Sequence, residues 1–571
     1  MERKDDNNTI LIDHVDDVGG HATASEELEE SESFHWRTYL VIMAVDMAYV
    51  AQLVALIGSG ALATNIAAVT GGQTVWFSSL ITIFTSLLGP PISQAADYWG
   101  RKLLLILMTT AGFVGCIVIS RATSYAGVLA GFSITGVAFG AQPLSITISS
   151  EVIPRRQRSY GQAIFGVMGC SSGVAALLVG GALTQNGHNE GFRVYYYIAA
   201  GLFGLAVILI AISYDPVRRE TEKELSFYDK LSKLDWPAYF LLAAGVVLFS
   251  IGLSWSQNPY EWSDPHVSVT FSLGMLSFIC LCLYACFWNK TGVLHHQLFR
   301  NRNFSIACGC LFVEGLSFFA ANSYLPYEAE VFFPSNAILT GLHFGIAFIA
   351  AMVGSFACAV FSWKTKTIRP PTVFAYLCFV IFFVLMAIIK VTASNNFWAY
   401  PIFLGIGFGI CLTTLTTAAQ FATPLELIST TTGVLLTARN LGATIGLAIY
   451  NAIFNNQLSK LPTKIAAATL PLGLPKTSVA SLVGALEAQE TESLSKIPGI
   501  SENIIEAAEF ALKNTYLEAF RYIWVTAGVF VFVAFIASFF LQENQANFST
   551  HVDAPVKGGT PQHIEKGPET A

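Results

Sequence analysis

Three ionisable residues lie inside long apolar stretches of the sequence: Asp46, Glu314 and Arg439. A charged side chain is costly to bury in such a stretch, so each of the three is a candidate for function. Burial disfavours the charged form of a carboxylate, and an isolated Asp46 or Glu314 could therefore exchange protons near neutral pH. We take all three as candidates for proton coupling. The alternative is a structural hydrogen bond or ion pair between helices.

Small polar side chains mark two further apolar stretches, around Gln142 and Ser145 and around Asn440 and Thr444. On a helix each pair falls on one face. Such a polar face either lines a path for a solute or hydrogen-bonds to a neighbouring helix. We take these four residues as substrate-path candidates.

The cysteines indicate neither a disulfide framework nor a metal centre. All ten lie within apolar stretches, where pairing into disulfides is not expected. Cys280, Cys282 and Cys286 are close enough in sequence for a metal site, but no His or carboxylate accompanies them at ligand spacing. We expect packing residues, no metal and no cofactor. No phosphate-binding loop ending in Gly-Lys-Ser/Thr occurs, so ATP drive is not expected.

Membrane-spanning helices must position these residues. The 571 residues are 53% hydrophobic and only 12% charged, whereas soluble domains have about 25% charged residues. A bilayer accepts an apolar outer surface, and a spanning helix needs roughly 20 apolar residues. We predict an all-α polytopic membrane protein with fourteen spans: 38–60, 75–95, 103–120, 127–150, 160–183, 194–213, 236–256, 268–288, 304–325, 338–362, 370–391, 397–420, 430–455 and 519–541.

The loop charges predict the orientation. With the N-terminus inside, the inner loops hold sixteen Lys and Arg residues, and the short outer loops and their edges hold only Arg121, Arg193 and Lys390. Basic residues favour the cytoplasmic side. We therefore expect both termini in the cytoplasm. The plasma membrane is the expected location, with the vacuolar membrane as the alternative.

The loop after the second predicted helix reads Ser-Gln-Ala-Ala-Asp-Tyr-Trp-Gly-Arg-Lys, residues 93–102. Asp97 stands at a helix end with Arg101 and Lys102 close by. A carboxylate there can accept hydrogen bonds from a helix N-terminus or from an arginine. Such a charged latch could hold two helix bundles in one state.

This loop resembles a signature of the major facilitator superfamily, with Ser93 at the position where the first glycine is usual. The run 150–158 is also similar to a signature of that superfamily. The resemblance implies a gating role for six residues: Asp97, Gly100, Arg101, Lys102, Glu151 and Arg158.

Longer runs at 89–102 and 140–158 resemble the fungal trichothecene efflux pump family, within the fourteen-span drug:proton antiporter branch. The resemblance implies six, two and six helices around a central cavity. It also implies export of a small amphipathic compound or toxin by alternating access, with proton antiport. The expected parts are an acidic disordered tail (1–36), a six-helix bundle (37–213), a linker with two extra helices (214–303), a second bundle (304–541) and a disordered tail (542–571).

Two features of the sequence differ from that branch. Phe132 stands where an arginine linked to proton coupling is usual, and Ala176 and Leu177 replace a glycine–proline pair. Asp46 matches an acidic position common in the first helix of the branch, so coupling is assigned to Asp46.

The outer loop 456–518 is too long for a tight turn. Its segments 478–486 and 502–512 have apolar residues at helical spacing. We expect short amphipathic helices on the outer membrane surface, which either pack there or cover the transport path.

The expected partners are a small-molecule substrate, the lipid bilayer and protons, with no nucleic acid, and the expected state is a monomer. The aromatic residues Phe318, Phe319 and Tyr324 suggest apolar cargo, or else core packing. Two alternatives stay open beside export: import of an iron-siderophore complex, and a membrane sensor that binds a solute without transporting it. An enzyme is not expected.

Overall fold

The computed structural model describes residues 36–72, 74–184, 188–216, 226–255, 260–289, 292–332, 337–390, 396–424, 427–487 and 497–543, together with Gln545, Phe548 and Asp553. The predicted tails, 1–36 and 542–571, lie almost wholly outside the described residues. The described part is helical and contains no β-sheet, as the sequence predicts.

The first group of helices comprises α2 (Trp36–Ala61), α3 (Ala63–Thr70), α4 (Val75–Trp99), α5 (Arg101–Arg121), α6 (Tyr125–Ala138), η1 (Phe139–Ala141), α7 (Gln142–Glu151), η2 (Arg155–Gln157), α8 (Arg158–Leu183) and α9 (Gly191–Ser213). The middle group comprises α11 (Phe227–Ser232), α12 (Trp236–Trp255), α13 (Pro265–Phe287) and α14 (His296–Arg300). The last group comprises α15 (Arg302–Phe332), α16 (Ala337–Thr365), α17 (Arg369–Ala387), α18 (Asn396–Phe421), α19 (Ile428–Leu458), α20 (Leu461–Thr469), η5 (Leu470–Leu472), η6 (Lys476–Ser478), α21 (Val479–Glu487) and α23 (Glu502–Ser538).

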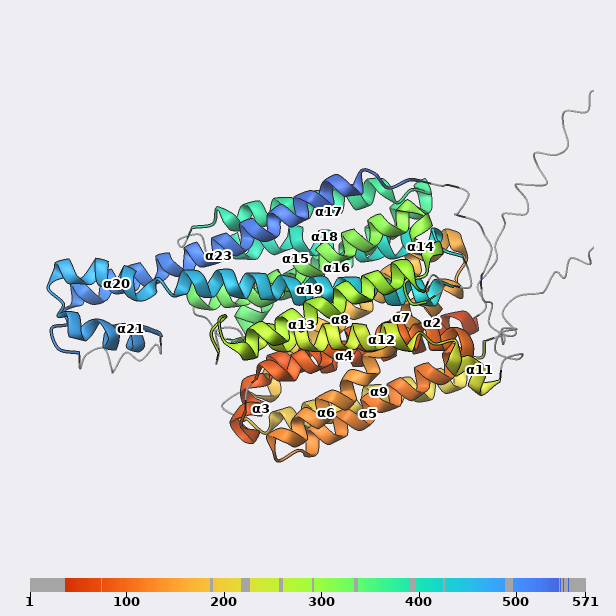
Figure 1. Cartoon of the computed structure of the whole chain (residues 1–571), viewed down its shortest axis with the longest axis horizontal. Helices are drawn as coiled ribbons and strands as arrows, with labels where there is room; N and C mark the ends of the chain where they lie inside the picture. Colours follow the sequence, from red (N-terminus) through yellow and green to blue (C-terminus); the bar gives the residue numbers. More distant parts are fainter. Residues whose placement is uncertain are drawn as a thin grey trace, which may run out of the picture.

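Thirteen helical segments of the described chain are long and apolar enough to cross a membrane. Each matches a predicted span, and α4 is the one predicted span outside that group. Its 25 residues run beside the other long helices in Figure 1. Gln94 and Asp97 lie in its C-terminal part.

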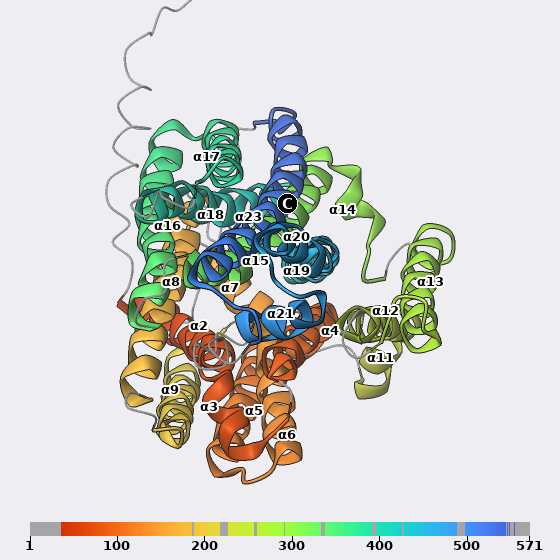
Figure 2. The same ribbon diagram turned by 90° about the vertical axis from the view of Figure 1, so that its left-hand side faces the viewer.

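The long helices form two bundles, one from α2 to α9 and one from α15 to α23 (Figures 1 and 2). Each has its own buried apolar core. The α8–α16 and α4–α19 pairs join the two bundles. The α12–α13 pair lies at the edge, with α12 against α4 and α13 outermost in Figure 2. Only 11% of the apolar window of α13 is buried within the described structure, so most of the surface of this helix faces away from the bundles.

The fourth predicted span is interrupted. Residues 125–151 form α6, a 3-10 turn and α7 instead of one regular helix. Pro143 explains the interruption, because a proline lacks the N–H of an α-helical hydrogen bond and collides with the preceding turn. The break places the polar residues of α7 at the junction of the two bundles.

The outer loop differs from the expected short helices on the membrane surface. The predicted helix at 478–486 is confirmed as α21, but residues 502–512 are the first turns of α23, which continues without a break to Ser538. These turns pack with α20 and α21 around a separate apolar core that includes Leu461, Leu482 and Ile504. We call residues 461–487 and 497–512 the lobe. It projects beyond one end of the bundle in Figure 1.

Glycines let α15 and α19 approach closely. A Cβ atom added at Gly315 would collide with the backbone carbonyl of Arg439, and one added at Gly442 would collide with that of Phe312. Close approach of two backbones is the usual role of small residues in membrane helices. The contact brings Glu314 and Arg439 opposite each other.

Replacing Gly315 by alanine should therefore destabilise the protein. Overpacking of a tight contact costs about 1–3 kcal/mol, and we expect a lower melting temperature in detergent. Gly309→Ala is the matched control, because it lies on the same helix and a Cβ there meets nothing within 4 Å. Equal melting temperatures for the two variants would contradict the proposed close contact.

Candidate functional site

A buried ion pair lies where α15 faces α19. Nε of Arg439 donates to Glu314 at 2.6 Å, and its Nη2 donates to the second carboxylate oxygen at 3.2 Å. The Glu314 side chain has no exposed surface, and that of Arg439 is 12% exposed. Two parallel hydrogen bonds give this pair a fixed geometry. The structure thus contains an ion pair between α15 and α19.

Three phenylalanine rings surround the guanidinium of Arg439. The rings of Phe318, Phe319 and Phe408 have their centroids 5.6–5.7 Å from it. Phe318 and Phe408 are stacked at 4.2 Å with an interplanar angle of 14°. A cation within about 6 Å of a ring centroid is attracted by the ring face. The site therefore combines a fixed positive charge with flat apolar surfaces.

The first bundle contributes Tyr49 to the same region. Its ring is stacked on Phe165 at 3.8 Å, and its hydroxyl interacts with Gln142 and with the charge of Arg439. Side chains of α2, α7 and α8 thus meet those of α15, α18 and α19. We call Tyr49, Phe165, Glu314, Phe318, Phe319, Phe408 and Arg439 the central site.

Asp46 lies one turn of α2 away from Tyr49 and is buried, 1% exposed. Its carboxylate lies near Ser149 of α7. In the described residues, Oδ1 of Asp46 and the hydroxyls of Ser145 and Ser149 have no hydrogen-bond partner of full geometry. The predicted polar face of α7 is thus buried against α2. A carboxyl group without an ion pair is suited to gaining and losing a proton.

The residues of the predicted latch meet at the other end of the bundle from the lobe, which we call the tail end. Arg101 forms ion pairs with Glu151 and, at 3.6 Å, with Asp97. Thr430 of α19 donates to Asp97 at 3.2 Å. One bundle is therefore hydrogen-bonded to the other through Asp97.

Close helix packing supports this latch. Gly100 links α4 to α5 with φ of +88°, a backbone conformation that residues other than glycine rarely adopt. Ser93, which replaces the usual glycine, lies against Gly433 of α19 and bonds to the carbonyl of Gly89 at 2.7 Å. Next to them Thr147 donates to Thr432 at 3.2 Å. These contacts close the tail end between the bundles.

Other predicted site residues lie elsewhere. Lys102 forms no ion pair within the described residues. Arg158 points to Ser150 and Asp553, away from the latch. Thr444 bonds to the backbone carbonyl of Asn440 within α19. Tyr324 contacts Tyr450 and Phe454 in another aromatic cluster. The part of the chain that the structure describes shows no cluster of potential metal ligands.

Sequence reasoning missed Tyr49, Phe165 and Phe408, because an aromatic residue in an apolar stretch carries no separate signal. It also missed Glu328, which is fully buried and accepts a hydrogen bond from Trp524 at 2.8 Å. The predicted span ended at 325, whereas α15 continues to Phe332. A longer span would have identified this buried acid.

The model of the Major Facilitator Superfamily matches residues 38–447, which is most of the chain. The chain belongs to the major facilitator superfamily. Members of this superfamily are membrane transporters and not enzymes, so the protein is a multi-pass membrane transporter. The superfamily signature around Asp97 thus identified the family correctly.

Curated relatives cover almost the whole chain. The chain is 25% identical to "Efflux pump FUS6" of Gibberella fujikuroi, over 89% of both chains. It is 24% identical to "MFS-type efflux transporter pyiT" of Pyricularia grisea, over 92% of this chain and 87% of that one. The protein is therefore related to fungal efflux pumps of the superfamily.

Solved structures support the fold. The proton:xylose symporter XylE aligns over 89% of this chain and 96% of its own, with a TM-score of 0.51 at 10% identity. A bacterial homologue of the human lysosomal transporter Spinster aligns over 88% and 98%, with a TM-score of 0.51 at 15% identity. At such identities the likeness concerns the fold alone.

The structure explains why a phenylalanine fits at position 132, where an arginine is usual in the antiporter branch. It is fully buried, lies 5.4 Å from the ring of Phe77 and makes an edge contact with Tyr196 at 5.6 Å. This face of α6 belongs to the apolar core of the first bundle, where an unpaired arginine would be costly. No described contact of Phe132 reaches the central site.

Replacing Glu314 and replacing Arg439 should destabilise the protein to different extents. Removing one partner of a buried pair costs about 3–5 kcal/mol when it leaves an uncompensated charge. Glu314 can take up a proton when Arg439 is lost, but Arg439 cannot lose its proton. We expect Glu314→Gln to lower the melting temperature more than Arg439→Gln does.

The double variant Glu314→Gln/Arg439→Gln separates charge from packing. It removes both charges and keeps two hydrogen-bonding amides, so it should be more stable than Glu314→Gln alone. Additive losses in the double variant, measured by thermal unfolding in the same detergent, would show that the two side chains do not act as a pair.

Proposed function

We propose that the protein is a secondary active exporter of a small amphipathic organic compound or toxin, working by alternating access around the central site. The observation that carries the proposal is the Glu314–Arg439 pair, ringed by aromatic side chains where the two bundles meet. Stacked rings bind flat apolar groups, and a buried ion pair orients a polar group on the same molecule.

Relatives named as an efflux pump and an efflux transporter, which align with nearly the whole length of the chain, support export as the direction of transport. We place the protein in the fourteen-span drug:proton antiporter branch, near the fungal trichothecene efflux pumps, with a six, two and six division of helices. The tail end faces the cytoplasm in this proposal, because the basic residues of the loops gather there. The plasma membrane is the proposed location.

Asp46 is the proposed proton-coupling residue. It is buried at the junction of α2 and α7, has no ion pair in the described structure, and lies one helical turn from Tyr49 of the central site. Glu314 is already neutralised by Arg439 and is less free to change its charge. The protein would then alternate between binding a proton at Asp46 and binding a substrate at the central site.

Export can be tested in proteoliposomes that carry the protein in a known orientation. We expect a pH gradient with the lobe side acidic to drive transport of fluorescent amphipathic compounds from the tail side to the lobe side. Asp46→Asn should reduce the driven flux at least tenfold and leave downhill exchange intact. Glu509→Gln, an exposed carboxylate of the lobe, is the matched control and should transport like the unmodified protein.

The same assay separates the alternatives. Uptake of ferric siderophores in the opposite direction would establish an importer. Binding without flux in either direction would establish a sensor. Full gradient-driven transport by Asp46→Asn would remove the coupling role from this residue while leaving export itself established.

A further inference from the structure

Arg439 has more hydrogen-bond donors than Glu314 uses. A guanidinium carries five N–H groups, and the two hydrogen bonds that this side chain makes to described residues both go to the Glu314 carboxylate. Three N–H groups therefore remain for another acceptor. The Glu314 side chain has no exposed surface, whereas 12% of the Arg439 side chain is exposed. The part of the ion pair that a ligand can reach is thus a hydrogen-bond donor.

Close helix packing fixes the direction of these donors. The backbone carbonyl of Arg439 lies so near Gly315 that a Cβ atom on that glycine would collide with it. The other end of the side chain is held by the two bonds to Glu314, the residue before the same glycine. A guanidinium held at both ends loses little freedom when an acceptor binds to it, and this favours binding.

The charges of the central site favour an uncharged acceptor. Glu314 neutralises Arg439, and both of its carboxylate oxygens accept from that guanidinium. A cation would meet the positive charge of Arg439 and a carboxylate that is already paired, and an anion would meet the negative charge of Glu314. Asp46, the buried carboxyl group of α2, is 1% exposed and offers a ligand almost no surface. A carbonyl oxygen accepts the remaining N–H groups without adding a charge.

Aromatic rings from both bundles set the shape of the ligand. Phe318 and Phe408 of the second bundle are stacked on each other, and Tyr49 of the first bundle is stacked on Phe165. Aromatic groups pack well against the faces and edges of other rings. Rings on both sides of the junction therefore suit a planar conjugated group.

We propose that the substrate is an uncharged, planar conjugated compound whose carbonyl oxygens accept hydrogen bonds from the N–H groups of Arg439 that Glu314 leaves unused. This substrate class rests on the proposed export function and narrows it. Arg439 is then a specificity-determining residue, because it selects an acceptor while the rings select a flat shape. A flat compound without an acceptor leaves these donors unpaired, which lowers its affinity.

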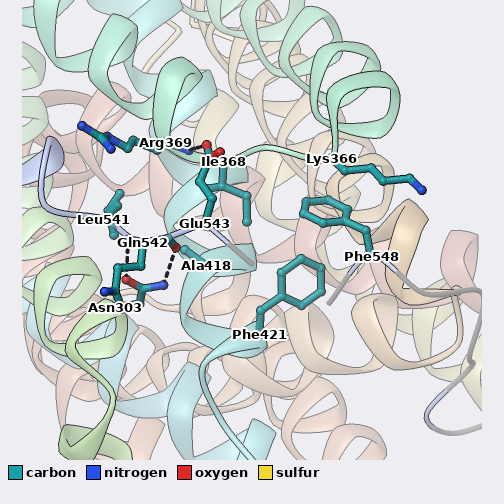
Figure 3. Close-up of a pocket in the computed structure, with 10 residues that line it drawn as sticks. All are labelled: Asn303, Lys366, Ile368, Arg369, Ala418, Phe421, Leu541, Gln542, Glu543 and Phe548. Atoms are coloured by element: carbon teal, nitrogen blue, oxygen red, sulfur yellow. Dashed lines mark hydrogen bonds between the residues drawn. The ribbon is translucent and has the colours of Figure 1, made fainter. Parts of the chain in front are cut away.

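A pocket at the tail end also has aromatic rings but places its arginine differently. It has a volume of about 350 Å³ and is lined by helix ends of the second bundle and by residues after α23 (Figure 3). Phe421 and Phe548 face each other there, and the guanidinium of Arg369 points away from the pocket. The Arg369 side chain is exposed. Arg369→Gln is therefore a matched control, since it removes a positive charge from the same bundle without changing the central site.

Four anthracene probes that differ in one substituent test this selectivity. The central ring carries a methyl ester, a propyl group, a carboxylate or a trimethylammoniomethyl group. Binding is measured by fluorescence anisotropy in nanodiscs, with the signal of empty nanodiscs subtracted. We expect the ester to bind at least tenfold more tightly than each of the other three probes. Arg369→Gln should leave all four affinities unchanged.

The double variant Glu314→Leu/Arg439→Met tests the role of Arg439 itself. It removes the donors and fills their place with apolar side chains, a replacement that buried ion pairs often tolerate. This variant should bind the ester and the propyl compound equally. A preference for the ester that survives in the folded variant would contradict the role of Arg439.

The probe comparison on the unmodified protein does not depend on that variant. Equal binding of the ester and the propyl compound would overturn the proposed substrate class. So would a carboxylate or trimethylammonium probe that binds as tightly as the ester. These results would leave export itself open, because binding is measured without a gradient. Loss of gradient-driven flux with the ester preference retained would instead contradict export.

Discussion

An arginine inside a membrane bundle keeps its charge at any physiological pH, so Arg439 must always have an anion or an electron-rich surface beside it. Glu314 and the rings of Phe318, Phe319 and Phe408 meet this requirement. The arrangement in turn needs α15 and α19 in close contact, which Gly315 and Gly442 allow. One buried charge thus sets the helix spacing and the chemistry of the region where the two bundles meet.

The tail end uses charge in a different way. Arg101 pairs there with Asp97 and Glu151, and Arg155 and Arg158 pair with Asp553. Such end contacts can be solvated when the bundles part. Alternating access requires contacts at the ends of the bundles that separate as one bundle rocks against the other.

Much of the fold could be predicted from apolar length and loop charge, because a bilayer leaves few other options for a helical chain. Asp46, Glu314 and Arg439 were identifiable because a charge among apolar residues is conspicuous. Their partners could not be identified in this way, because the pairing of Glu314 with Arg439 joins residues 125 apart in sequence. The lobe and Asp553 were missed for the same reason, since their contacts depend on packing that no local spacing encodes.

The central claim is that the two bundles alternate around the central site and that the tail end is closed in this structure. The most direct test is the distance between spin labels at Lys102→Cys and Lys364→Cys, one on each bundle, in nanodiscs by pulsed electron resonance. The Cys282→Ser/Cys286→Ser background would be used for this measurement. We expect a short and a longer distance, with a transported compound and pH shifting the balance between them. A single distance under all conditions in which the protein transports would contradict the account.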